Sequence, residues 1–257
     1  MRAILFTICV SALLLITASC SKETAVYDKE PTTFLNYRFE NRSQLASQGG
    51  LGLKYQGVPL PQGVFGGTFV PGKAVFTFYN TRTGATLLET EMDLKPDMET
   101  LYVFQPDSNA APVLLSNTQL NEPPPPAGYF KLKIASFCIN ALSPRLDIVL
   151  NMLDADYIPT IPVDTIESVG TSFDGAPFYL IKKDPVLPSY ALSFIDHNTK
   201  ETILDKAGNR YITPGMIEAY NPIDIYTYYL TEEDPPEMDI FLFKNNRYYN
   251  IGVYPLF

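Results

Sequence analysis

One histidine and one interior cysteine are the side chains of this sequence best suited to acid–base or nucleophilic chemistry. His197 lies in the segment Asp196–Lys200, which reads as a hairpin turn, whereas Cys138 lies much earlier in the chain. A catalytic thiol needs a base within hydrogen-bonding reach, and we expect His197 to be a solvated turn residue. Cys138 shares strand parity with Leu132 and Ile134, so we expect it to be a small buried hydrophobe. A single histidine offers no histidine-rich metal site.

Two acidic stretches carry the oxygen ligands that calcium prefers. Their members are Asp154, Asp156, Asp164 and Glu167 in the first, and Glu232, Glu233, Asp234, Glu237 and Asp239 in the second. The first departs from the EF-hand pattern, because the central glycine is missing and Thr165 stands at its twelfth position. We expect solvated loops, assign no metal site and no cofactor, and leave calcium binding in a loop as the alternative.

No motif in the sequence predicts an enzyme. The paired carboxylates of a glycosidase are defined by their separation in space, so the 28 acidic residues do not by themselves indicate one. Neither a Gly-x-Ser-x-Gly elbow nor a Walker loop occurs. The glycine-rich stretches 49–52 and 63–67 have no following helix pattern and read as loops or strand kinks.

The first 23 residues have the pattern of a secretory signal followed by a modified cysteine. Arg2 is positively charged, residues 3–16 are almost wholly apolar, and small residues lead up to Cys20. The apolar run is too short for a stop-transfer helix. A cysteine in this place resembles a bacterial lipobox, with Thr17 where leucine is usual. We predict that Cys20 carries lipid as the mature N-terminus; the alternative is an ordinary cleaved signal with a coincidental cysteine.

The charge and cysteine content of the mature chain exclude several classes of function. Removing residues 1–19 takes away Arg2 and leaves 18 basic against 28 acidic side chains, a formal charge of about −10. Phosphate contacts come from lysine and arginine, so nucleic acid is not an expected partner. With Cys9 in the signal and Cys20 lipidated, Cys138 has no disulfide partner.

The apolar segments beyond Thr33 are short, rich in β-branched and aromatic residues, and flanked by turn residues. They are Phe34–Phe39, Ala74–Tyr79, Leu101–Phe104, Leu132–Phe137, Ile148–Leu150, Tyr190–Ile195, Ile223–Leu230, Met238–Phe243 and Tyr248–Tyr254. This spacing predicts an all-β sandwich or barrel. Within the second segment, Ala74, Phe76 and Phe78 should share one face of a strand.

An internal repeat predicts two tandem domains. Residues 76–88 align without gaps with residues 192–204, and residues 94–102 align with residues 212–220 after a two-residue insertion, with seven identities in 22 positions. Four prolines lie between the copies and favour an extended spacer. The predicted organisation is a signal peptide (1–19), a lipid-anchored tether (20–33), a first β-sandwich (34–120), a proline-rich linker (121–128) and a second β-sandwich (129–257).

The lipobox, the opening strands (36–41 and 129–137), the Asp-bearing strand 146–151 and the repeated strand–turn–strand together resemble a known family. It is the tandem Ig-like domain of unknown function found in surface lipoproteins of Bacteroidota. The resemblance covers most of residues 34–116 and, less closely, 129–257; the first half has Gly52–Gly57 where the Asp-bearing strand is expected. It implies two antiparallel Ig-like sandwiches and a cell-surface location, and it implies no catalytic residues.

The tyrosines are the remaining candidates for binding. The chain has 17 tyrosines and no tryptophan, and the second half contains Tyr226, Tyr228, Tyr229, Tyr248, Tyr249 and Tyr254. Tyrosine suits protein interfaces and sugar stacking. Alternating core and surface positions of strands are the expectation for any one of them, and the absence of tryptophan counts against a sugar-stacking platform.

These observations predict a non-catalytic lipoprotein of the outer membrane, displayed at the cell surface. The first hypothesis is an adhesion or assembly module whose partner is a protein. Such a partner could add a strand to an exposed sheet edge. The second is an accessory glycan-binding protein of a polysaccharide uptake system, which calls for exposed tyrosines beside polar side chains in one concavity. An enzyme would need carboxylates that converge in a cleft.

Overall fold

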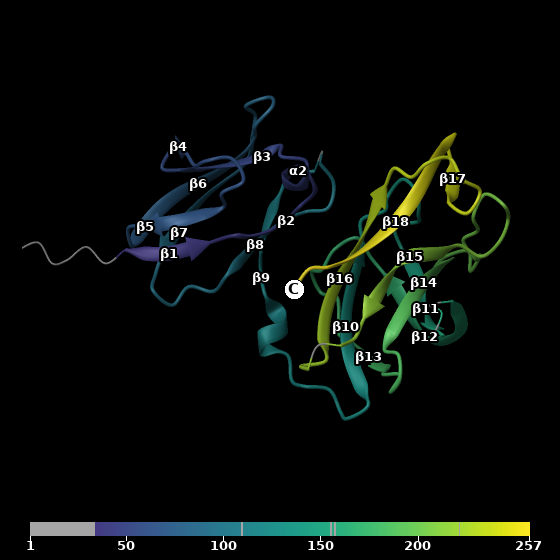
Figure 1. The fold of residues 1–257 in the computed structure, drawn as a ribbon. Coiled ribbons are helices and arrows are strands. Elements are labelled where there is room, and N and C mark those ends of the chain that lie inside the picture. Colours follow the sequence, from purple (N-terminus) through teal and green to yellow (C-terminus); the bar gives the residue numbers. More distant parts are fainter. Residues whose placement is uncertain (1–33, 109, 155, 157, 221) are drawn as a thin grey trace, which may run out of the picture.

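Strands make up nearly all of the regular structure, in two groups of sheets that follow one another along the chain (Figure 1). The computed structural model describes residues 34–108, 110–154, 156, 158–220 and 222–257. Within them, the helical elements are the one-turn α2 (Gln44–Ser47) and the 3-10 turn η1 (Thr118–Asn121). The all-β prediction is therefore confirmed.

The first half, residues 34–121, contains three sheets. One has the order β4 (Val58–Pro59), β3 (Leu51–Tyr55), β6 (Gly72–Asn80), β7 (Thr86–Leu94). The second has the order β2 (Glu40–Ser43), β8 (Leu101–Gln105), β9 (Val113–Ser116), and the third pairs β1 (Leu35–Arg38) with β5 (Gly66–Phe69). Ala74, Phe76 and Phe78 are buried together, as their alternation predicts.

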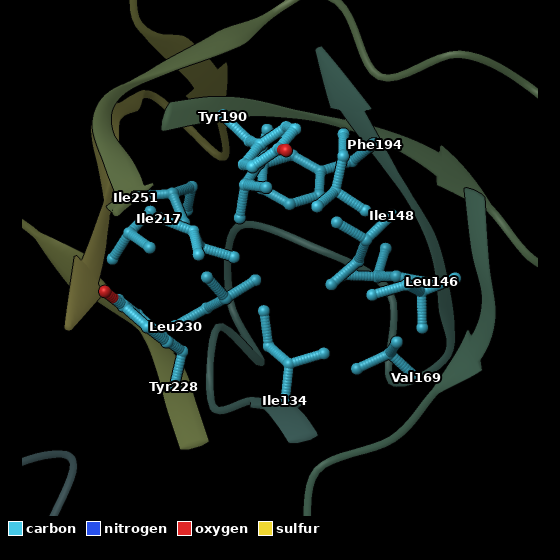
Figure 2. Packing of buried hydrophobic residues seen from close by; sticks show 14 of the residues in the cluster. Ile134, Leu146, Ile148, Val169, Tyr190, Phe194, Ile217, Tyr228, Leu230 and Ile251 are labelled. Atoms are coloured by element: carbon cyan, nitrogen blue, oxygen red, sulfur yellow. The ribbon is translucent and has the colours of Figure 1, made fainter. Parts of the chain in front are cut away.

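The second half, residues 129–257, is a sandwich of two sheets. The five-stranded sheet has the order β13 (Tyr179–Lys182), β10 (Tyr129–Ser136), β16 (Ile225–Glu233), β18 (Arg247–Pro255), β17 (Leu242–Lys244). The four-stranded sheet has the order β12 (Pro159–Val169), β11 (Leu146–Leu153), β14 (Ser189–Asp196), β15 (Ile212–Glu218). Inward-facing side chains of both sheets form one core, with Ile134 and Leu230 from one sheet and Ile148 and Phe194 from the other (Figure 2).

Two of the strand pairings among the described residues are parallel, whereas the resemblance implied antiparallel sandwiches. β2 runs parallel to β8, and β10 runs parallel to β16. β10 opens the second half and β2 is the second strand of the first half, and each pairs with a strand far along the chain. The connections between them are long enough for the crossover that a parallel pair requires.

The two aligned segments form the same turn and diverge after it. Asn80 and Asp196 occupy aligned positions, and each side chain accepts hydrogen bonds from the backbone N–H groups two and three residues later. Gly84 and Lys200, also aligned, both have positive φ, 74° and 60°. The first copy then continues as β7, whereas the second forms only isolated bridges at Thr202 and Leu204.

Among the described residues, the two halves meet through an aromatic cluster and through hydrogen bonds that include three side-chain contacts. The ring of Phe104 in β8 lies 5.1 Å from that of Phe137 and 5.0 Å from that of Tyr229, in edge-to-face contacts. Leu256 completes the buried group. The three side-chain hydrogen bonds are Arg42 Nε to the Leu256 carbonyl (3.0 Å), Gln44 Nε2 to Thr231 Oγ1 (3.2 Å) and Thr231 Oγ1 to the Pro106 carbonyl (2.7 Å). Where one domain ends and the next begins stays a prediction.

Candidate functional site

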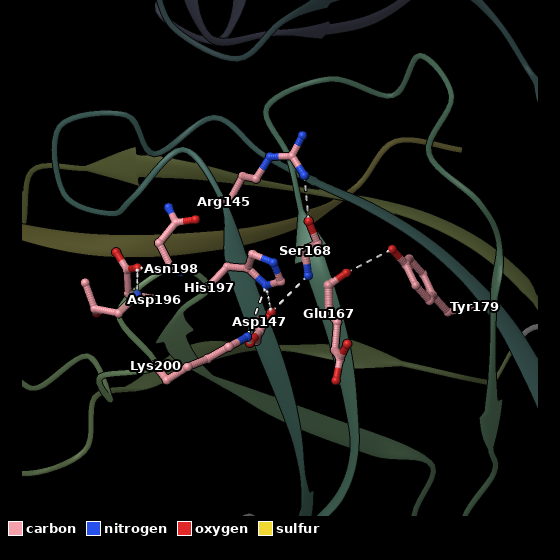
Figure 3. A network of polar contacts seen from close by, with 10 residues as sticks. Arg145, Asp147, Glu167, Ser168, Tyr179, Asp196, His197, Asn198 and Lys200 are labelled. Atoms are coloured by element: carbon pink, nitrogen blue, oxygen red, sulfur yellow. Dashed lines mark hydrogen bonds and ion pairs between the residues drawn. The ribbon is translucent and has the colours of Figure 1, made fainter.

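His197 lies in the predicted turn, but it is not the solvated residue that the sequence suggested. Its Nδ1 donates to Oδ1 of Asp147 at 2.6 Å, and Lys200 Nζ lies 2.7 Å from Oδ2 of the same carboxylate (Figure 3). The backbone N–H of Ser168 also donates to Asp147, at 2.9 Å. Asp147 is 4% exposed, on the outer face of β11.

The electrostatics of Asp147 are those of a structural carboxylate. Burial by itself raises the pKa of this carboxyl, but the hydrogen bonds from Lys200, the Ser168 N–H and His197 outweigh it and lower the pKa to about 2. Ser168 has φ of 57° at a point where the β11–β12 register shifts. Asp147 therefore satisfies an N–H group that the bulge removes from the ladder.

The Asp147–His197 pair lacks a nucleophile within the described part of the chain. The nearby hydroxyl groups of Ser143 and Ser168 bond to Asp196 and Arg145 respectively, and neither bonds to His197. An acid–base–nucleophile relay needs that last contact. The network thus fastens a turn and a bulge to one strand.

Cys138 is buried, as its strand parity predicted, although it lies just beyond the end of β10. Burial raises the pKa of its thiol far above the ordinary value, with a weaker opposing effect from a hydrogen bond involving Ser136. A thiol in this state is a poor nucleophile. The prediction of a core residue is confirmed.

The two acidic stretches do not gather into a metal site among the described residues. Asp154 Oδ1 accepts from the N–H groups of Asp156 and Ile158 and closes a turn. Asp239 lies 3.2 Å from Lys206 Nζ, and Asp234 pairs with Arg247. These carboxylates act in local turns and ion pairs.

A polar cleft lies between the two halves and encloses about 470 Å³. α2 and the segment after β8 form one wall, and the ends of β16 and β18 with the loop after β10 form the other. Its lining residues are Gln44, Gln48, Pro106, Asp107, Ser108, Phe137, Asn140, Thr231, Glu232, Glu233, Asp234, Arg247 and Tyr249. The volume falls within the roughly 300–1,000 Å³ range typical of small-molecule sites.

The carboxylates of the second-half wall are held by neighbouring donors. Glu232 accepts from the N–H groups of Asn140 (2.6 Å) and Ala141 (2.7 Å) and from the Asn140 amide (2.8 Å). Asp234 accepts from the guanidinium group of Arg247. Glu233 accepts from the Asn250 amide at 2.7 Å and from the Tyr254 hydroxyl. The wall is therefore fixed in position before any ligand arrives.

A larger and more open groove of about 690 Å³ follows β1 and β5 in the first half. Tyr37, Phe65 and the glycines of the stretch 63–67 line it, with the exposed side chains of Asn36 and Arg38 at its edge. The hydroxyl group of Tyr37 is already bonded to the Glu99 carbonyl. The groove contains fewer fixed polar groups than the cleft.

Sequence reasoning named Glu232, Glu233 and Asp234 of the cleft, but as a solvated loop. It did not name Gln44, Gln48 or Ser108. These residues line the cleft because the two halves dock against each other, and the sequence does not show that docking. The sequence predicted alternating core and surface positions for the tyrosines. Tyr226, Tyr228 and Tyr249 lie in the core of the second half and Tyr254 is 40% exposed, whereas Tyr229 is buried against Phe104 of the first half. No sequence signal distinguishes an amide facing a cleft from one facing bulk water.

Cys20, the signal peptide and the tether lie outside the described residues, so the lipidation site stays a prediction. No helix among the described residues is long and apolar enough to cross a bilayer.

Neither a protein-family model nor a curated protein matches the chain. Solved structures give weak likenesses to streptococcal proteins. A family 41 carbohydrate-binding module from streptococcal virulence factors, described for alpha-glucan recognition, has 11% identity over 75% of this chain and 92% of that chain, with a TM-score of 0.23. A streptococcal virulence factor described for alpha-glucan binding has 13% identity over the same shares, with a TM-score of 0.25.

A third structure is a product complex of SpuA, a multi-modular glycogen-degrading pneumococcal virulence factor. It has 13% identity over 76% of this chain and 21% of that chain, with a TM-score of 0.24. Likenesses at this level carry no argument about the ligand of this protein.

Proposed function

We propose that this protein is a non-catalytic binding protein of the outer membrane, anchored through lipid on Cys20 and displayed at the cell surface as a tandem Ig-like lipoprotein. The observation that carries the binding role is the preformed polar cleft between the halves, whose wall carboxylates are already paired. The groups that could do chemistry lie elsewhere: Cys138 is buried in the core, and His197 is bonded to Asp147.

The partner of such a protein is a macromolecule at the cell surface, either a protein or a glycan. For a protein partner, β7 is an edge strand without an internal proline, open to pairing with an added strand. For a glycan partner, in an accessory role in polysaccharide uptake, the cleft supplies amide, hydroxyl and carboxylate groups in one concavity. The cleft favours this second candidate.

Location and anchoring are tested by protease treatment of intact cells that express either the wild-type chain or Cys20→Ala. We expect the wild-type protein to fractionate with the outer membrane and to be cleaved on whole cells, and the variant to lose membrane retention. Cys9→Ala, within the same leader, is the matched control and should behave like wild type. Protection of the wild type until the outer membrane is breached would contradict surface display, and retention of Cys20→Ala would contradict lipidation.

A further inference from the structure

The cleft between the halves offers a ligand several fixed polar groups in one recess. Thr231 marks its floor, since its hydroxyl group accepts from Gln44 and donates to the Pro106 carbonyl across the junction. Both halves therefore contribute to the same recess, and its shape depends on their docking.

The charge state of the lining limits the class of ligand. Glu232 and Asp234 are each satisfied by donors of the protein itself, and Glu233 likewise. A cation that coordinates Glu232 directly would compete with these donors, one of which, the N–H group of Ala141, is buried. Anionic ligands such as phosphates are repelled by the same carboxylates. An uncharged polar ligand meets neither obstacle.

Several polar groups of the lining are unused by the protein. Among the described residues, the Gln48 amide and the Ser108 hydroxyl form no hydrogen bond, although both line the cleft. The bound carboxylates keep further lone pairs that can accept from hydroxyl groups. The half-buried ring of Phe137 adds an apolar surface beside them. Donors, acceptors and an aromatic face in one recess match a polyhydroxylated ring.

A protein partner fits this recess less well. Stable protein interfaces bury about 800 Å² on each partner around an apolar centre, whereas the cleft is recessed and its lining is mostly polar. We infer that the cleft between the two halves binds one or two rings of an uncharged glycan, with Gln48 and Ser108 in direct contact with sugar hydroxyl groups. This inference rests on the proposed binding role and specifies its ligand class.

The test is calorimetric titration of the purified full chain with maltotetraose, cellotetraose and mannotetraose, with trilysine and tetraserine as the cationic and uncharged peptide probes. We expect saturable binding of at least one oligosaccharide and none of either peptide. The double variant Gln48→Ala/Ser108→Ala should weaken that binding roughly tenfold, the effect of losing two hydrogen bonds. Asn198→Ala, an exposed amide outside the cleft, should leave it unchanged.

A second variant keeps the inference testable if the double substitution acts indirectly. Ser108→Trp fills the cleft from one wall and should abolish oligosaccharide binding, while circular dichroism shows whether the fold is retained. Binding of a peptide alone, no binding of any of the three oligosaccharides, or oligosaccharide binding that survives both cleft variants would overturn the inference. None of these results bears on Cys20, so the proposal of lipid anchoring and the inference about the ligand class are tested independently.

Discussion

Asp147 shows how one side chain can organise three segments of the chain. Its carboxylate binds Lys200 and His197 from the turn after β14 and the N–H group of Ser168 from the bulge in β12. Charge-assisted hydrogen bonds of this kind are about twice as strong as neutral ones. The residue that stood out only as part of an Asp-bearing strand thus has a definite physical role.

The pKa of Asp147 predicts how stability depends on pH. Because the folded-state pKa is about 2 and the unfolded value is about 3.9, the charged carboxylate stabilises the fold above pH 4, and this contribution is lost as the pH falls toward 2. We expect Asp147→Asn to lower the free energy of unfolding by roughly 2 kcal/mol at pH 7. Urea unfolding of both proteins at pH 7 and at pH 3 measures this difference in the free energy of unfolding.

Glu201→Gln on the same turn is the matched control, because it removes an exposed carboxylate with no side-chain partner among the described residues. It should change stability little at either pH. A stability difference between wild type and Asp147→Asn that does not shrink at pH 3 would show that the charge of Asp147 is not its source.

For single residues, the sequence predicted which side chains are buried better than it predicted their hydrogen-bond partners. The inward position of Cys138 follows from strand parity, because alternation is a local property. The pairing of His197 with Asp147 joins residues 50 positions apart, and it depends on the register of β11 against β14. Local pattern does not contain that register.

Among the elements, β7 is the exposed edge of its sheet and carries three acidic side chains. Glu89, Glu91 and Asp93 share the outer face, where Glu91 pairs with Lys73 and Asp93 with Lys95. If two copies of β7 paired antiparallel about Thr90, Glu89 would face Glu91 across the ladder. Like charges directly opposite destabilise such a pair, so the strand resists self-association.

We predict that Glu89→Thr/Glu91→Thr increases self-association, because it removes this repulsion and adds β-branched residues to an open edge. Sedimentation velocity over a range of protein concentrations should show a dimer or larger species that the wild type lacks. Glu99→Thr/Glu201→Thr removes the same charge from exposed positions outside the strands and should stay like wild type. Equal behaviour of the two double variants would contradict a role for the edge.

The repeat shows where element prediction ends. Its turn was predictable, since a run of polar residues that contains Asn or Asp between two apolar strands is a local signal. The second copy loses the following strand because Asp205–Asn209 forms another turn, closed by the bond from Asp205 N–H to the Asn209 carbonyl. β15 then occupies the place beside β14 that β7 occupies beside β6.

At the scale of the whole molecule, Phe104 couples the two halves. It is 2% exposed, and its ring contacts rings of Phe137, Phe173 and Tyr229 from the other half. Truncating a buried phenylalanine to alanine lowers the free energy of unfolding by roughly 3–5 kcal/mol. At Phe104 the lost contacts are those that join the two halves. We expect Phe104→Ala to unfold in two calorimetric transitions and the wild type in one.

Phe104→Leu retains most of the buried volume and should keep a single transition. A single transition at lower temperature for Phe104→Ala would show that the hydrogen bonds across the junction suffice for coupling. The all-β class was predictable from short alternating segments, but this docking was not, because it unites aromatic residues from four distant segments.

The parallel pairing of β2 with β8 has a mechanical consequence for the lipid-anchored protein proposed above. Force from the N-terminal side enters β2 at Glu40, whereas force from an occupant of the cleft enters β8 through Pro106, next to Gln105. In a parallel pair these two points lie at opposite ends, so the load is sheared across all the evenly spaced hydrogen bonds at once. The strands do not unzip one bond at a time, so this pair is loaded in the geometry in which its hydrogen bonds share the force.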